Sequence, residues 1–91
     1  MRVNKISLDK NELPRKVEVS LTLRDVVVLS NLLGRMSPTK FSELLPGDEN
    51  WDALVEIYQG LDGTVLNTFF DGGLYSAEGY LRDGEIPDVL F

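Results

Sequence analysis

Hydrophobic and polar residues alternate strictly over residues 15–23. The apolar residues of this stretch, which share one side of an extended chain, are Val17, Val19, Leu21 and Leu23. A period of two is typical of a β-strand with one buried and one solvated face. The pattern therefore predicts a strand over 15–23, in an antiparallel sheet that carries helices on one side only.

Residues 2–8 also have the composition of a strand. The parity of Val3 disagrees with that of Ile6 and Leu8, so we expect this strand to start late or to carry a β-bulge. The polar residues between Asp9 and Pro14 have turn chemistry and predict the connection between the two strands.

A helical period begins directly after the second strand. Thr22 and Asp25 form a T-x-x-D pattern, in which each side chain can accept a hydrogen bond from a free backbone amide. The apolar residues that then share one helical arc are Val26, Leu29, Leu32, Leu33 and Met36. The spacing predicts a helix over 23–36 with this arc in the core. The β-branched run at 26–28 leaves a strand open as the alternative there.

The other sides of this helix supply the first candidate contact residues. Val27, Ser30 and Gly34 lie together on its flank, where small side chains favour close approach of a neighbouring backbone, in this chain or in a second copy. Arg24, Asn31 and Arg35 fall opposite the apolar arc. The candidate partner-binding residues on the helix are Arg24, Val27, Asn31 and Arg35.

Two further helices follow. Ser37 and Pro38 are typical of N-cap and first-turn positions, and they predict a short helix over 38–45. Acidic and amide residues at 48–52 precede a run with helical spacing, which predicts a helix over 50–60 with Gly60 as its terminator.

The last third of the chain is rich in Asp-Gly turn signals. A β-hairpin over 64–81 is the favoured interpretation, although the spacing from Val65 to Phe70 also fits two helical turns. Residues 85–91 form an apolar tail. Asp88, Leu90 and Phe91 in this tail are candidate contacts with another molecule.

Charge is distributed unevenly along the 91 residues. Residues 1–45 contain eight basic and five acidic residues, whereas residues 46–91 contain one basic and ten acidic residues. The length predicts a single domain with a small core, and small cores favour assembly with another chain. The absence of cysteine, of an apolar leader and of a long apolar run predicts a cytoplasmic protein without a membrane segment.

The residue types limit the available chemistry. Without histidine or cysteine there is no Ser–His–Asp or Cys–His nucleophile system and no ordinary zinc site. Asp48, Asn50 and Asp52 resemble the start of an EF-hand loop, but Ala53 and Gln59 replace the required glycine and glutamate. The interrupted basic residues and the net charge of −6 disfavour nucleic acid. No cofactor is predicted.

Part of the chain resembles short bacteriophage and prophage accessory proteins. The resembling stretches are the strand that runs into 21–23, the helix that closes at 32–37, and the later helix that carries Ile57 and Tyr58. The resemblance covers about half of the chain and includes no catalytic residue. It implies a class of small proteins that bind host machinery or block host defence.

The sequence therefore predicts an α+β fold, with a small antiparallel sheet and two main helices and one short helix on one face. The favoured function is that of a non-enzymatic protein-binding module that self-associates. More specifically, we expect a phage-encoded inhibitor of a host or host-defence protein that acts in the host cytoplasm. One alternative is a sequestering protein that binds a nucleotide or another anionic small ligand at a basic and aromatic subunit interface. A small carboxylate-based enzyme is the second alternative.

Overall fold

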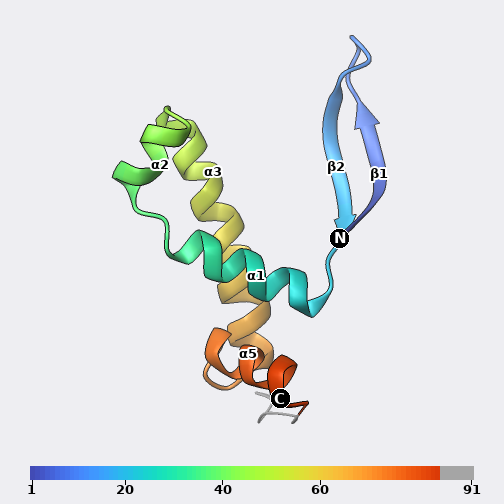
Figure 1. The fold of residues 1–91 in the computed structure, drawn as a ribbon. Helices are drawn as coiled ribbons and strands as arrows, with labels where there is room; N and C mark the ends of the chain where they lie inside the picture. Colours follow the sequence, from blue (N-terminus) through green and yellow to red (C-terminus); the bar gives the residue numbers. More distant parts are fainter. Residues whose placement is uncertain (85–91) are drawn as a thin grey trace.

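A computed structural model describes residues 1–84 and shows a β-hairpin that leads into a helical body (Figure 1). The strands are β1 (Arg2–Leu8) and β2 (Pro14–Ser20). The helices are α1 (Leu23–Gly34), α2 (Pro38–Leu44), α3 (Asp48–Tyr58), the π-helical η1 (Gln59–Leu66), α4 (Asn67–Phe69) and α5 (Leu74–Asp83). The predicted α+β class is confirmed.

The two predicted strands pair with each other in an antiparallel hairpin. The register shifts between Val3 and Lys5, which confirms the predicted irregularity in β1. The Asp9 carboxylate organises the turn, because it accepts hydrogen bonds from the backbone amides of Asn11 and Leu13. The polar connection was therefore predicted correctly.

The predicted end of the second strand is wrong by three residues, since β2 ends at Ser20. Leu21 and Leu23 keep the alternating pattern but pack against the helical core. The strand stops there because Thr22 is the N-cap of α1, and its capping hydrogen bonds fix the helical start.

The helices do not cover a face of the sheet, which corrects the predicted packing. Among the described residues, neither strand makes extensive contact with a helix, and the hairpin stands beside the body rather than under it (Figure 1). Nearly every strand residue is exposed. A two-stranded ribbon is too narrow to give three helices a common packing surface, so the helices bury their apolar residues against one another.

The core forms where α1 packs against η1 and α5. Its buried residues are Val26, Val27, Leu66 and Ala77. The buried face of α1 is rotated relative to the predicted arc: Val27 and Ser30 are buried, whereas Leu32 is 59% exposed. Gly34 explains the rotation, because a Cβ atom there would lie 3.0 Å from Cε1 of Tyr58 in the α3 helix. The small flank residues therefore pack within the chain.

The predicted hairpin over 64–81 is wrong, because the end of η1, the short α4 and most of α5 occupy this region, with a turn at 70–73 between α4 and α5. Gly60 does not end the preceding helix either. The η1 helix continues through it with π-helical hydrogen bonds, in which the amide of residue i+5 donates to the carbonyl of residue i. This spacing brings residues four and five apart onto one face, so Leu61, Val65 and Leu66 all turn toward the core.

The two remaining helices agree with the sequence. The Ser37 hydroxyl accepts a hydrogen bond from the Lys40 amide, and Pro38 occupies the first turn of α2. The α3 helix begins at Asp48, two residues earlier than predicted, with Asp48 and Glu49 in its first turn. Negative charge at this end is favoured by the helix dipole.

Leu66 supplies the first test of this core. It is fully buried at the centre of the α1–η1–α5 contact. Replacement of Leu66 by alanine should lower the free energy of unfolding by about 2–5 kcal/mol, as for other buried leucines. Leu44→Ala, at a position that is 71% exposed, is the matched control and should cost less than about 0.5 kcal/mol. Equal losses in urea denaturation would contradict this core.

Ser30 supplies a second test, with the opposite sign. Its hydroxyl oxygen is fully buried and has no hydrogen-bond partner among the described residues. A buried polar group without a partner is destabilising, so Ser30→Ala should raise the free energy of unfolding by about 1 kcal/mol. Ser42→Ala, which removes an exposed hydroxyl bonded to the Thr39 carbonyl, should not. A destabilised Ser30→Ala protein would show that the hydroxyl does have a partner.

Candidate interaction surface

The orientation of α1 is fixed at its start. The Thr22 hydroxyl accepts a hydrogen bond from the Asp25 amide at 3.1 Å, and the Asp25 carboxylate accepts one from the Thr22 amide at 3.0 Å. The Asp25 carboxylate also lies 2.7 Å from the amino group of Met1. This reciprocal capping confirms the predicted T-x-x-D signal, and it holds the first turn of α1 where the hairpin joins the body.

The side of α1 that faces away from the core presents a mixed apolar and basic surface. Val28 and Leu32, one helical turn apart, are 56% and 59% exposed. Polar and basic residues surround them. We call this set the α1 surface, and its residues are Arg24, Val28, Asn31, Leu32 and Arg35. Exposed apolar side chains beside arginine are typical of the centre of a protein–protein interface.

The α1 surface is hollowed around Val28. One hollow of about 350 Å³ is lined by Val28, Asn31, Leu32 and Arg35. A second, of about 400 Å³, lies between α1 and α5 and is bordered by Arg24, Glu78 and Arg82. A third, of about 360 Å³, adjoins Met1 and Leu21. Val28 lines all three hollows, and therefore projects between depressions that side chains of another molecule can occupy.

A chain of hydrogen bonds holds the polar part of this surface. The Arg35 Nε donates to Asn31 Oδ1 at 2.7 Å, and the Asn31 Nδ2 donates to Glu78 Oε1 at 2.9 Å. The second bond crosses from α1 to α5, so it ties the two helices together beside the hollow that lies between them. Side chains held in this way lose less conformational freedom when a partner binds.

The structure separates the sequence-predicted contact residues into three groups. Arg24, Asn31 and Arg35 lie on one exposed side of α1, as their helical spacing predicted. Val27 is only 7% exposed and belongs to the core, which corrects its assignment to a partner contact. The three residues predicted in the tail, Asp88, Leu90 and Phe91, lie outside the described residues.

Sequence reasoning did not select Val28 and Leu32. Leu32 was assigned to the core because it fits the apolar arc. A usable signal was present in the small flank residues: if Ser30 and Gly34 mark the packed side of α1, residues on the opposite side must face solvent. The helical wheel then places Val28 and Leu32 at the surface.

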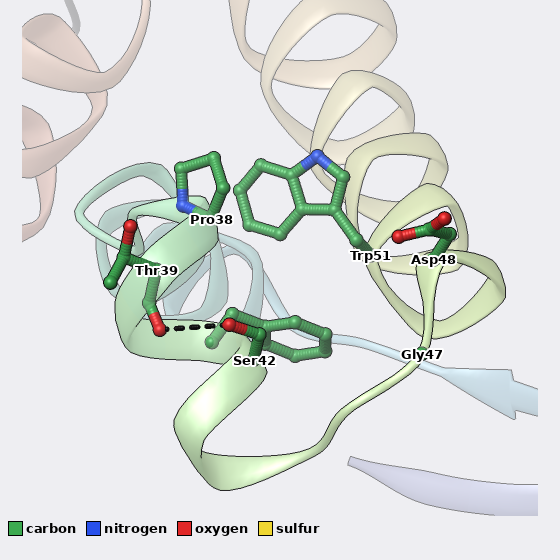
Figure 2. Close-up of a pocket in the computed structure, with 7 residues that line it drawn as sticks. Pro38, Thr39, Ser42, Gly47, Asp48 and Trp51 are labelled. Carbon is green, nitrogen blue, oxygen red and sulfur yellow. Dashed lines mark hydrogen bonds between the residues drawn. The ribbon is translucent and has the colours of Figure 1, made fainter.

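A different hollow lies between α2 and α3, with a volume of about 280 Å³ (Figure 2). The Trp51 and Phe41 rings, whose centroids are 5.6 Å apart, form its aromatic side, and Asp48 lies at its edge. The Ser42 hydroxyl donates to the Thr39 carbonyl at the opposite side (Figure 2). The ring contact explains how a seven-residue helix is held against α3.

Local hydrogen bonds shift the pKa values of Asp25, Arg82 and Asp83. The hydrogen bond from the Met1 amino group, together with the Thr22 amide, lowers the pKa of Asp25. Hydrogen bonding between Arg82 and Asp83 lowers the pKa of the carboxylate and raises that of the guanidinium. In the same residues, no three acidic side chains lie close enough together to hold a metal ion. These shifts follow from local capping and pairing at exposed positions.

Comparisons with protein-family models, with curated proteins and with solved structures gave no match to this chain. No helix within residues 1–84 has the length and apolar content needed to cross a bilayer. The resemblance to phage accessory proteins therefore stays a prediction, and the surface geometry carries the functional argument.

The lowered pKa of Asp25 predicts how the stability of the body depends on pH. A carboxyl group that is more acidic when folded stabilises the folded state above its unfolded pKa of 3.8, and this contribution is lost as the pH falls through the lower folded value. Asp25→Asn should therefore be less stable than the unchanged protein at pH 6, and this difference should be smaller near pH 2. Urea denaturation at both pH values measures this, and a constant difference would contradict the prediction.

Proposed function

We propose that this chain is a non-enzymatic protein-binding module and that the α1 surface contacts its partner. The observation that carries the proposal is the position of Val28, an exposed apolar side chain between three hollows with Arg24 and Arg35 on either side. The centres of protein interfaces are more apolar than their rims and are enriched in arginine, and the neighbouring depressions can receive anchor side chains of the partner.

The shape of the surface supports a protein partner over a small substrate. The hollows adjoin one another along α1 and are open to solvent, so they do not enclose a small molecule. Small-molecule sites bury most of their ligand in a concave pocket. A surface with several open depressions instead matches the side chains of a larger partner.

The charges of the α1 surface indicate the chemistry of that partner. Arg24 and Arg35 are exposed and can pair with carboxylates, and the guanidinium group favours bidentate contacts. We therefore expect acidic side chains around an apolar contact on the partner. Together with the resemblance to phage accessory proteins, this supports the more specific proposal of an inhibitor that binds a host or host-defence protein in the host cytoplasm.

A second candidate function is the binding of an anionic small ligand, such as a nucleotide. It is favoured by the hollow between α1 and α5, where Arg24 and Arg82 border the same space. The Glu78 carboxylate also lines this hollow, and Arg82 is already paired with Asp83. Both features weaken an anion site, so the protein-binding function is preferred.

Affinity capture with variants tests the preferred function. Tagged protein should retain one acidic partner from host lysate, and Leu32→Glu should weaken the purified complex about 30-fold or more, since it places a charge at the apolar centre. Leu44→Glu introduces the same charge at a still more exposed position on α2 and should bind normally. Both variants should keep the helical circular dichroism of the unchanged protein.

Three outcomes would contradict this proposal. Equal binding by the Leu32→Glu and Leu44→Glu proteins would place the contact elsewhere. Retention of no protein would remove the function altogether. A co-purified nucleotide or other anion, found by mass spectrometry and lost in Arg24→Ala, would favour the second candidate instead.

A further inference from the structure

The hairpin has one apolar and one charged face. On one face Val3 lies opposite Val19, Ile6 lies opposite Val17, and Leu8 lies opposite Pro14. We call these six residues the apolar hairpin face. On the other face the cross-strand pairs are Arg2 with Ser20, Lys5 with Glu18, and Ser7 with Lys16. All the charged residues in these register pairs therefore lie on one side of the ribbon.

A β-bulge completes the apolar hairpin face. Val3 and Ile6 are three residues apart, so regular alternation would put them on opposite sides. The shift between Val3 and Lys5 inserts one extra residue, Asn4, and brings Val3 onto the side of Ile6. The extra side chain lies on the charged face, where the Asn4 side-chain amide donates a hydrogen bond to the Ser20 hydroxyl.

Nothing in residues 1–84 covers the apolar hairpin face. Its valines, isoleucine and leucine are between 41% and 54% exposed, and neither strand makes extensive contact with a helix (Figure 1). A two-stranded hairpin without a third strand or a covering element is at best marginally stable in water. Within residues 1–84, the apolar hairpin face therefore lacks the covering surface that stabilises a two-stranded ribbon.

We propose that the same face of a second copy of this chain covers it, with the two ribbons stacked face to face. Two apolar faces related by a two-fold axis complement each other, and all the register-paired charges then point outward into water. Stacked sheets pack about 10 Å apart, a spacing that valine, isoleucine and leucine side chains fill.

The area agrees with a reversible dimer. The valines, isoleucine and leucine of this face expose roughly 400–450 Å² in each copy, so stacking removes at most about 900 Å² from water in total, which is below the roughly 1,200 Å² of stable interfaces and within the range of weak, transient ones. We therefore expect an equilibrium between one and two chains that depends on concentration, not a permanent dimer.

Other arrangements cover the apolar hairpin face less well. Edge-to-edge pairing of two hairpins would complete backbone hydrogen bonds but keep the apolar side in water. To select one unrelated partner over other apolar surfaces, the apolar hairpin face would need polar groups of its own, and the register pairs place none there. The face is thus better suited to a copy of itself.

Two variants with the same charge change on opposite faces test the proposal. Val17→Glu puts a carboxylate at the centre of the apolar hairpin face, and Ser7→Glu puts one on the charged face opposite Lys16. In a concentration series by analytical ultracentrifugation, the unchanged protein and Ser7→Glu should form dimers, and Val17→Glu should dissociate about 100-fold more readily or more. Helical circular dichroism should stay unchanged in both, because the strands make no extensive contact with the helices of residues 1–84.

The natural absence of cysteine allows a second measurement. A protein with Ile6→Cys should be joined into dimers by a short bismaleimide linker, whereas one with Ser7→Cys should not, because the two sites lie on opposite faces. A monomer at all concentrations, a dimer that Val17→Glu does not weaken, or preferential cross-linking through Ser7→Cys would each overturn the proposal. None of these variants alters the α1 surface, so this result and the partner-binding result are independent.

Discussion

The close packing of α1 against Tyr58 and Leu66 determines how the rest of the helical body is arranged. Gly34 leaves room for the Tyr58 ring, and the fully buried Ser30 and Leu66 lie on the packed side of the contact zone. Because small side chains let helices approach, this flank becomes the inner side of α1. Everything on the opposite side, including Val28 and Leu32, is then left at the surface.

Signals that act within a few residues could be predicted from the sequence. The T-x-x-D capping pattern, the Ser37-Pro38 helix start and the irregular parity of Val3 all act through neighbouring backbone groups, and the structure contains each of them. The α+β class follows from the same signals. Three of the α1 contact candidates were also placed correctly, because their position depends only on helical spacing.

Features set by distant packing could not be predicted in this way. The arc from Val26 to Met36 is the more hydrophobic side of α1, yet close approach to Tyr58 selects the adjacent flank for burial. The region 64–81 is mostly helical because Leu66 and Ala77 find burial against α1, which outweighs its turn-rich composition. A chain with several glycines gives weak local preferences, and tertiary contacts then decide.

The hairpin joins the body only at its base, and this separation has a consequence for how the protein can change over time. Substitutions in β1 and β2 leave the α1–η1–α5 core untouched, since the strands make no extensive contact with the described helices. Mutations there are thus free of the folding constraints that act on Leu66 or Ala77. Natural selection can therefore alter what the hairpin binds without altering whether the helices fold.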